Sequence, residues 1–364
     1  MESKAFHIPS LDGIRTLAFL IVFFSHAGLE RIVPGGFGVT IFFFLSGFLI
    51  TTLLRREYHR TSSISLRGFY LRRITRIWPA FYTVLALSSA ATLAGLLPGT
   101  LQPVPLLSQL LHLANYQLIF HGPEGMPAGS GVYWSLAVEE HFYLAFPLLY
   151  LLLMMKARVK PAAQAGIFLT GCLLVLAWRC HLVLGHHVDE HRTFYATDCR
   201  LDSLLFGCAL AVYGNPILDP PLGSDRLWRG LLLPAGLAVL LFSLVYRHPQ
   251  FRETFRYTLQ GIALIPVFVA AIRFPKSLPF AIFNWKPVAA SGALTYPLYL
   301  VHFTILVAVW KTVPGWHPAF QGTLAFTASV FVSWLIHRFI ERPVAALRRP
   351  AKSPAPAGLE TSRP

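Results

Sequence analysis

Ten long apolar stretches follow one another along this 364-residue chain and limit the folds open to it. They lie near residues 11–28, 36–54, 77–97, 133–155, 162–184, 198–213, 230–246, 257–272, 288–310 and 318–340. Most approach the roughly 20 residues with which an apolar α-helix crosses a bilayer. Because lipid cannot satisfy backbone polar groups, a helix bundle is the expected fold. The sequence therefore predicts an all-α polytopic membrane protein with about ten transmembrane helices.

The composition excludes a soluble enzyme of this length. Hydrophobic residues make up 55% of the chain and charged residues 13%. Apolar stretches continue to residue 340, so we expect no short cleavable signal peptide followed by a polar domain. The net charge is +15, and the basic residues behind it lie in short loops. This pattern favours the positive-inside bias of a membrane protein over binding to nucleic acid. Four cysteines without ligand-like spacing predict packing residues, with neither disulfides nor metal.

A further apolar stretch, residues 104–120, decides the topology because prolines and polar residues interrupt it. If it does not span, both termini are cytoplasmic, and the inside segments carry 21 Lys and Arg against six outside. If it spans, the split is 13 against 14, which breaks the positive-inside rule. We therefore predict a re-entrant or interfacial helix near 104–120. Residues 1–345 are expected to form one transmembrane domain and residues 346–364 a disordered cytoplasmic tail.

Arg15 and His26 are joined by ten uncharged residues on the first predicted helix. They lie roughly 16 Å apart along a helix axis, about half a bilayer core. Ionisable side chains in hydrocarbon are costly and usually mark function. His26 is a candidate general base for a hydroxyl nucleophile, although a bond to a carbonyl would also explain it. Arg15 can instead pair with Asp12 and only anchor the helix end.

The densest positive cluster ends with Arg72, Arg73 and Arg76 at the start of the third helix. Arg73 and Arg76 are three residues apart and share a helix face. Guanidinium groups bind phosphate oxygens in pairs, so these arginines are candidates for holding a cytoplasmic cofactor with a pyrophosphate. A topology signal or anionic-lipid binding would explain them equally well.

Two adjacent carboxylates, Glu139 and Glu140, follow Trp134 at the start of another predicted helix. Our topology puts them at the outer end, level with His26. A carboxylate beside a histidine can raise its basicity, an arrangement that activates hydroxyl groups. The two side chains point about 100° apart, so we expect only one to face the bundle. Interfacial acids facing lipid headgroups are the alternative.

Asp198 and Asp202 flank Arg200 at the start of a later helix. A structural ion network and a substrate contact are equally compatible with this pattern. His302 lies well within the helix near 288–310. It can line the same cavity as the other candidates or only bond a neighbouring helix.

Six stretches taken together resemble the acyltransferase-3 family of integral membrane O-acyltransferases. They are Leu11–His26 with its Arg15-to-His26 spacing, Gly38–Ile50, Arg73–Tyr82, Trp134–Tyr143, Tyr296–His302 and Glu341–Pro343. Each stretch alone is weak, but the six occur in the family's order and cover nearly the whole chain. The resemblance implies a bundle of helices that moves an acyl group, most often acetyl, from cytoplasmic acyl-CoA to a hydroxyl. In that family the acceptor is usually a surface polysaccharide, a lipid-linked sugar or a secondary metabolite.

The resemblance also implies roles for single residues. It implies His26 as the central catalytic residue, Arg15 as its partner, Arg73 and Arg76 as donor-binding residues, and Glu139 or Glu140 as functional. We add Arg72 as a donor contact, and Trp134, Asp198, Arg200, Asp202 and His302 as candidate substrate contacts. A soluble esterase-like domain that some members carry is not seen here, so a step that needs one would fall to a partner.

The leading hypothesis is therefore a bacterial inner-membrane O-acyltransferase without a metal. Acyl-CoA would bind through the cytoplasmic arginines, and its thioester arm would run along Arg15 towards His26. Direct transfer and a covalent acyl-histidine relay both stay open, as does a homo-oligomer. The alternative is a transporter or flippase for a lipid-linked sugar or anionic substrate, whose path buried charges would line. A membrane glycosyltransferase would need acidic residues in a larger outer loop.

Overall fold

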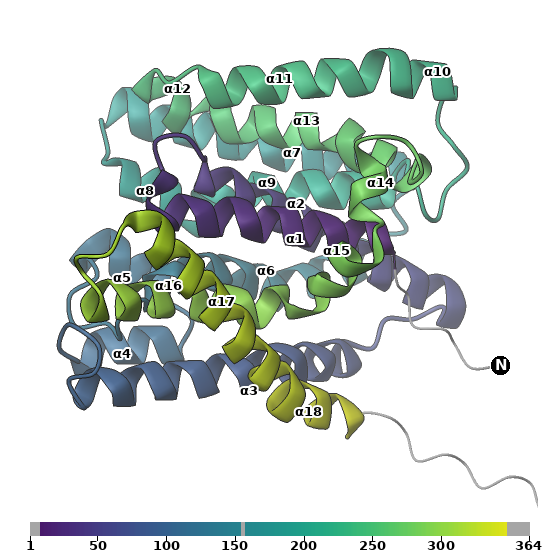
Figure 1. Cartoon of the computed structure of the whole chain (residues 1–364). Coiled ribbons are helices and arrows are strands. Elements are labelled where there is room, and N and C mark those ends of the chain that lie inside the picture. Colours follow the sequence, from purple (N-terminus) through teal and green to yellow (C-terminus); the bar gives the residue numbers. More distant parts are fainter. Residues whose placement is uncertain (1–7, 154–156, 348–364) are drawn as a thin grey trace, which may run out of the picture.

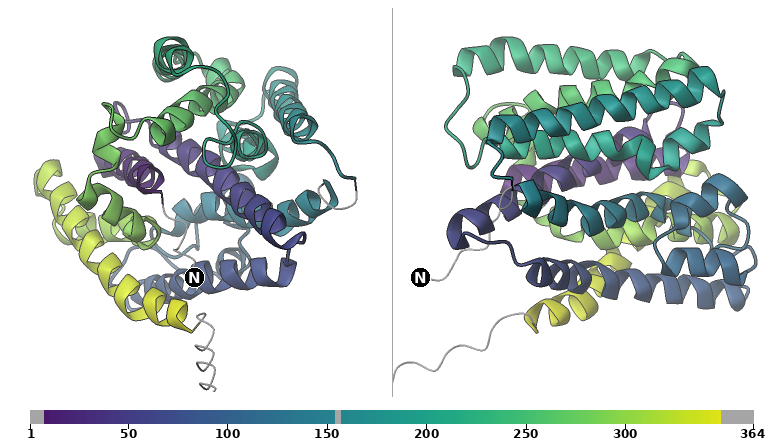
Figure 2. Two further views of the ribbon diagram at one scale, coloured as in Figure 1. Left: turned by 90° about the vertical axis from the view of Figure 1, so that its right-hand side faces the viewer. Right: turned by 180° about the vertical axis from the view of Figure 1, so that it is seen from behind.

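The computed structural model of the protein describes residues 8–153 and 157–347. In these residues the regular elements are helices, and no strand occurs. The long helices are α1 (Pro9–Phe24), α2 (Gly35–Thr61), α3 (Leu66–Leu93), α6 (Trp134–Leu151), α7 (Pro161–Cys180), α9 (Thr197–Val212), α11 (Leu233–Val245), α13 (Phe255–Arg273), α16 (Thr295–Thr312) and α17 (Pro318–Ile336). The all-α prediction is confirmed, and each predicted apolar stretch has a helix. Most run alongside one another, whereas α17 crosses the bundle obliquely (Figures 1 and 2).

Short helices gather at the two ends of the bundle (Figure 1). At one end are α4 (Pro103–Leu110), α5 (Ala114–His121), α8 (Glu190–Tyr195) and α12 (Pro249–Glu253). Towards the other end are α10 (Asp225–Leu227), α14 (Phe280–Phe283), α15 (Lys286–Ser291) and α18 (Arg342–Ala346), together with the start of α1. The start of α1 and α18 therefore share one end. Most of the predicted tail, residues 348–364, lies outside the described residues.

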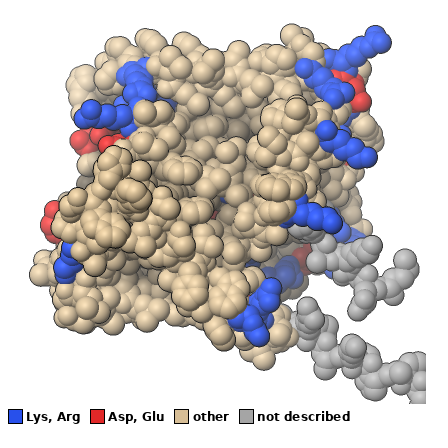
Figure 3. All heavy atoms as spheres, viewed as in Figure 1, with Lys and Arg blue, Asp and Glu red and all other residues tan. Residues whose placement is uncertain are grey.

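Seven helical segments among the described residues are long and apolar enough to cross a membrane. They contain α1, α2, α7, α11, α13, α16 and α17. The other predicted spans are α3, α6 and α9, which carry the arginines and carboxylates of the predicted site. On the face shown in Figure 3, charged side chains lie mostly towards the two ends, with a broad uncharged area between them. These features fit a multi-pass membrane protein.

The interrupted stretch 104–120 forms α4 and α5, each eight residues long. At about 1.5 Å per residue, each measures roughly 12 Å, less than half the thickness of a bilayer core. Pro103 and Pro105 lie in the first turn of α4, where proline suits a helix start. His112 has a left-handed backbone conformation and separates the two helices. Neither helix is long enough to span.

Helix α2 is central to the bundle and packs closely against α1 and α9. A Cβ added to Gly47 would lie 2.0 Å from the carbonyl oxygen of Leu204 on α9. At Gly38, an added Cβ would lie 2.6 Å from the carbonyl oxygen of Ala18 on α1. Gly38 and Gly47 therefore allow close backbone approach to α1 and α9, which fixes the position of the α2 residues between them.

Candidate active site

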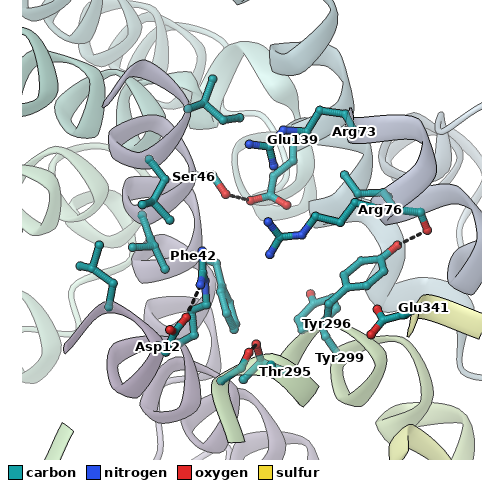
Figure 4. Close-up of a pocket in the computed structure, with 18 of the residues that line it drawn as sticks. Asp12, Phe42, Ser46, Arg73, Arg76, Glu139, Thr295, Tyr296, Tyr299 and Glu341 are labelled. Carbon is teal, nitrogen blue, oxygen red and sulfur yellow. Dashed lines mark hydrogen bonds and ion pairs between the residues drawn. The ribbon is translucent and has the colours of Figure 1, made fainter. Parts of the chain in front are cut away.

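A cavity of about 620 Å³ opens among α1, α2, α3, α6, α16 and α18 (Figure 4). Its charged lining residues are Asp12, Arg15, Arg73, Arg76, Glu139, Glu140, Glu341 and Arg342. Apolar side chains such as Leu11, Leu49 and Leu53 complete the wall. The cavity is thus large enough for a small-molecule ligand and joins residues that lie far apart in the sequence.

Three of the four predicted donor-binding arginines line this cavity. Arg73 and Arg76 extend into it from α3 (Figure 4). Arg15 reaches it from α1, where it pairs with Asp12. The Arg73 guanidinium also lies over the Tyr143 ring, 5.2 Å from its centroid. A ring face stabilises a cation in this position without neutralising it. The cavity therefore presents guanidinium groups from two helices to whatever it binds.

Arg72 differs from its neighbour Arg73 and does not line the cavity. Its Nη2 lies 2.8 Å from Oε2 of Glu57, and its side chain is 55% exposed. Successive helix residues point about 100° apart, and Arg72 turns towards Glu57 at the surface while Arg73 turns into the cavity. The expectation that Arg72 joins Arg73 and Arg76 in one phosphate site is therefore wrong in position.

Both carboxylates of α6 line the arginine cavity, although only one of them was expected to face the bundle. The Ser46 hydroxyl donates to Glu139, and the Tyr143 hydroxyl donates to the Ser46 Oγ over 3.2 Å. Ser46 lies eleven residues into α2, roughly 16 Å from the end near His26. The topology predicted from the sequence placed Glu139 and Glu140 at the same depth in the membrane as His26. In the structure, both line the cavity that Arg15 and Arg73 also line. The reason is that α6 carries them a further turn and a half inwards from Trp134.

His26 lies where the first helix ends and contacts His302 of α16. It belongs to a turn of π-helix, Ser25–Leu29, in which Gly28 has a positive φ of 100°. Its Nδ1 lies 3.0 Å from Nε2 of His302, and the planes of the two rings are 9° from parallel. His302 is fully buried, and its Nδ1 lies 2.8 Å from the carbonyl oxygen of Tyr299. The two predicted histidines therefore form one hydrogen-bonded pair.

The cavity ends one layer of side chains from this pair. Neither histidine lines it, but Phe42, Ser135 and Tyr299 do. The Tyr299 hydroxyl lies 2.6 Å from the Ser135 Oγ, and its ring is 5.9 Å from that of Phe42. The same Tyr299 ring lies 5.5 Å from His302. Tyr299 thus lies between the cavity and His302, with Phe42 packed beside it.

The acids of α9 pair with arginines other than Arg200. Asp202 bonds Arg179 of α7 over 2.7 Å, with both side chains fully buried. Asp198 bonds Arg192 over 2.5 Å. Neither acid lines the cavity. The geometry therefore supports a structural ion network over a substrate contact, and the paired arginines are Arg179 and Arg192 instead of Arg200.

Arg200 itself is fully buried among aromatic rings. Its guanidinium lies 4.0 Å from the centroid of the Tyr257 ring and 5.7 Å from that of Trp134. Its Nη2 donates to the Thr40 hydroxyl over 3.0 Å. Trp134 and Arg200, both candidate substrate contacts, are therefore in contact with one another and outside the cavity.

Several lining residues were not singled out as site residues by the sequence. Between α17 and α18, His337 Nδ1 lies 2.6 Å from Oε2 of Glu341, and Arg342 Nε donates to His337 Nε2 over 3.3 Å. Glu341 and Arg342 belong to the stretch Glu341–Pro343 quoted for the resemblance, and both line the cavity. Ser46 and Tyr299 stood inside motifs quoted for the resemblance, which was the only signal for them. In the described ranges, no group of three or more His, Cys, Asp or Glu is arranged to hold a metal ion.

Comparison with known proteins gives consistent matches. The model of a family described as an acyltransferase domain matches residues 8–338. The peptidoglycan O-acetyltransferase OatA of Listeria monocytogenes is 31% identical over 93% of this chain, and 56% of that protein is covered. The O-acetyltransferase OatA of Staphylococcus aureus is 29% identical over 93% of this chain, with 57% of that protein covered. The chain thus spans about half the length of these relatives. No solved structure matches it.

Proposed function

Because this chain belongs to the acyltransferase domain family, we propose that it is a membrane O-acetyltransferase. It moves an acetyl group from acetyl-CoA to a hydroxyl group of a saccharide. The names of its relatives support acetyl as the group, since both are O-acetyltransferases. The Listeria relative is named for peptidoglycan, which supports a cell-wall saccharide as the acceptor. The excess of Lys and Arg in alternate loops supports a setting in the cytoplasmic membrane of a bacterium, with the arginine cavity open to the cytoplasm.

The charges of the cavity support acetyl-CoA as the donor. CoA carries a diphosphate and a 3′-phosphate, and Arg15, Arg73 and Arg76 offer guanidinium groups that bind phosphate oxygens in pairs. The volume of about 620 Å³ lies within the range of small-molecule sites. Apolar side chains deeper in the wall suit the uncharged pantetheine arm.

The observation that carries the proposal is the double contact of Tyr299. Its side chain lines the arginine cavity, and its carbonyl oxygen bonds His302, which contacts His26. A thioester arm that runs from Arg73 to Tyr299 would therefore end one layer of side chains from His26. Movement of Phe42 or Tyr299 would bring the thioester and the imidazole together.

His26 then acts as the general base. Its imidazole accepts the proton of the acceptor hydroxyl while that oxygen attacks the thioester carbonyl. The carbon–sulfur bond breaks, and the CoA thiolate leaves and takes the proton from His26. The products are the acetyl ester and CoA. A thioester is already activated, so positioning and a base supply much of the catalysis.

The proposal is tested with cells that contain or lack this chain. Mass spectrometry of digested cell-wall glycans should show a mass increment of one acetyl group that depends on the chain. His26→Ala should abolish the increment, while the purified variant still binds acetyl-CoA. Absence of the increment, together with no binding of acetyl-CoA to the purified chain, would contradict the proposal. Transport of the saccharide without any change in its mass would favour the flippase alternative.

A further inference from the structure

His302 is a buried histidine that the acyl-transfer scheme above leaves without a task. Its ring lies beside that of His26, with the centroids 5.2 Å apart, and Phe19 packs edge-on against it at 5.7 Å. It lies in the middle of α16, whereas His26 lies at a helix end followed by residues with non-helical backbone angles. The ring of His302 is therefore held more firmly, and it can orient the ring of His26.

The hydrogen bonds of His302 fix where its proton lies. A carbonyl oxygen only accepts, so the bond to Tyr299 requires a proton on Nδ1 of His302. A neutral imidazole carries one proton, and complete burial disfavours the charged ring. Nε2 of His302 is therefore an acceptor.

The proton of His26 follows from this acceptor. Its Nδ1 lies 3.0 Å from Nε2 of His302, so Nδ1 of His26 must carry the proton and donate it. In neutral His26 the lone pair is then on Nε2, the nitrogen that faces away from His302. A base with the opposite tautomer would present an N–H to the acceptor hydroxyl and could not remove its proton.

We propose that His302 is a positioning residue that holds His26 in the Nδ1-protonated tautomer, so that Nε2 is the basic atom. This inference rests on the proposed role of His26 as the base. His302 does the work that a carboxylate performs in a hydrolase triad, but as a neutral acceptor backed by the Tyr299 carbonyl. The arrangement suits a buried site because it introduces no further charge.

The kinetic test compares two substitutions of His302 in the purified full chain. His302→Leu removes the acceptor and should lower kcat roughly hundredfold with little change in the KM for acetyl-CoA, as misplacement of a catalytic group does. His302→Gln keeps an oxygen that can accept from His26 and should retain most activity. The control Tyr133→Phe removes another buried hydrogen bond to α16, of 3.0 Å to the Leu300 carbonyl, and should leave kcat unchanged.

A second measurement does not depend on activity. Nitrogen-15 NMR of labelled histidine rings should show His26 with its proton on Nδ1, assigned by the signal lost in His26→Gln. His302→Leu should abolish that preference. The inference is overturned by the opposite tautomer, by unchanged kcat in His302→Leu, or by equal losses in the Leu and Gln variants. If the wild-type chain shows the expected tautomer but transfers no acetyl group, the proposed function fails and the positioning of His26 stands.

Discussion

Arg72 and Arg73 form a matched pair at the residue scale, because they are neighbours with opposite surroundings. Arg73 lines the cavity, whereas Arg72 pairs with Glu57 at the surface. A hydrogen bond from a charged group contributes about 1.5–3 kcal/mol, which is roughly 10- to 100-fold in affinity. Arg73→Gln should therefore weaken acetyl-CoA binding by this factor, measured by titration calorimetry. Arg72→Gln should leave the Kd nearly unchanged, and an equal loss in both would show that surface charge alone attracts the donor.

Asp202 and Asp198 form a second matched pair, for stability. Asp202 and Arg179 are both fully buried, whereas the side chain of Asp198 is 41% exposed beside Arg192. Removing one partner of a buried pair strands a charge and costs about 3–5 kcal/mol. An exposed pair contributes about 1 kcal/mol or less. Asp202→Ala should therefore lower the melting temperature in detergent far more than Asp198→Ala. Similar shifts in the two variants would mean that the buried arginine finds another partner.

At the scale of elements, the crossing of α2 and α9 holds the site together. It fixes the position of α2. This helix brings Ser46 into contact with Glu139 and contributes Phe42 to the cavity wall. Added Cβ atoms at Gly47 and Gly207 would lie 2.0 and 2.1 Å from backbone oxygens of the facing helix. Backbone atoms cannot move aside as a flexible side chain can, so only glycine fits at this crossing.

Gly47→Ala should therefore separate α2 from α9. Overpacking costs about 1–3 kcal/mol, and contact with backbone should put this variant at the upper end of that range. Gly166→Ala on α7 is the control, since nothing lies within 4 Å of its added Cβ, and alanine favours a helix. The melting temperature should fall in the first variant and hold or rise in the second. If Gly47→Ala melts as the wild type does, the crossing is looser than described.

At the scale of the whole molecule, the sequence predicts helices well and their contacts poorly. Apolar length is a local property and it located the long helices, whereas the count of Lys and Arg in the loops argued against 104–120 as a span. The contact of His26 with His302 joins residues 276 positions apart, and that of Ser46 with Glu139 joins residues 93 apart. No local pattern encodes such pairs. The spacing of Glu139 from Trp134 along α6 is local, but its contact with Ser46 is not, because that contact depends on which residue of α2 stands opposite.

The orientation of the bundle in the membrane is the last prediction. The positive-inside count puts the end with α18 in the cytoplasm and the end with α12 outside. Arg60 at the end of α2 and Gln250 in α12 are both exposed, and they lie at opposite ends of the bundle. In a Cys180→Ala background, whose other cysteines are buried, a membrane-impermeant thiol reagent should label Gln250→Cys in intact cells. Arg60→Cys should react only after the membrane is opened. That reaction also serves as the control, because it shows that the introduced thiol is reactive. Labelling of Arg60→Cys in intact cells would reverse the orientation and place the arginine cavity on the side where no CoA is available.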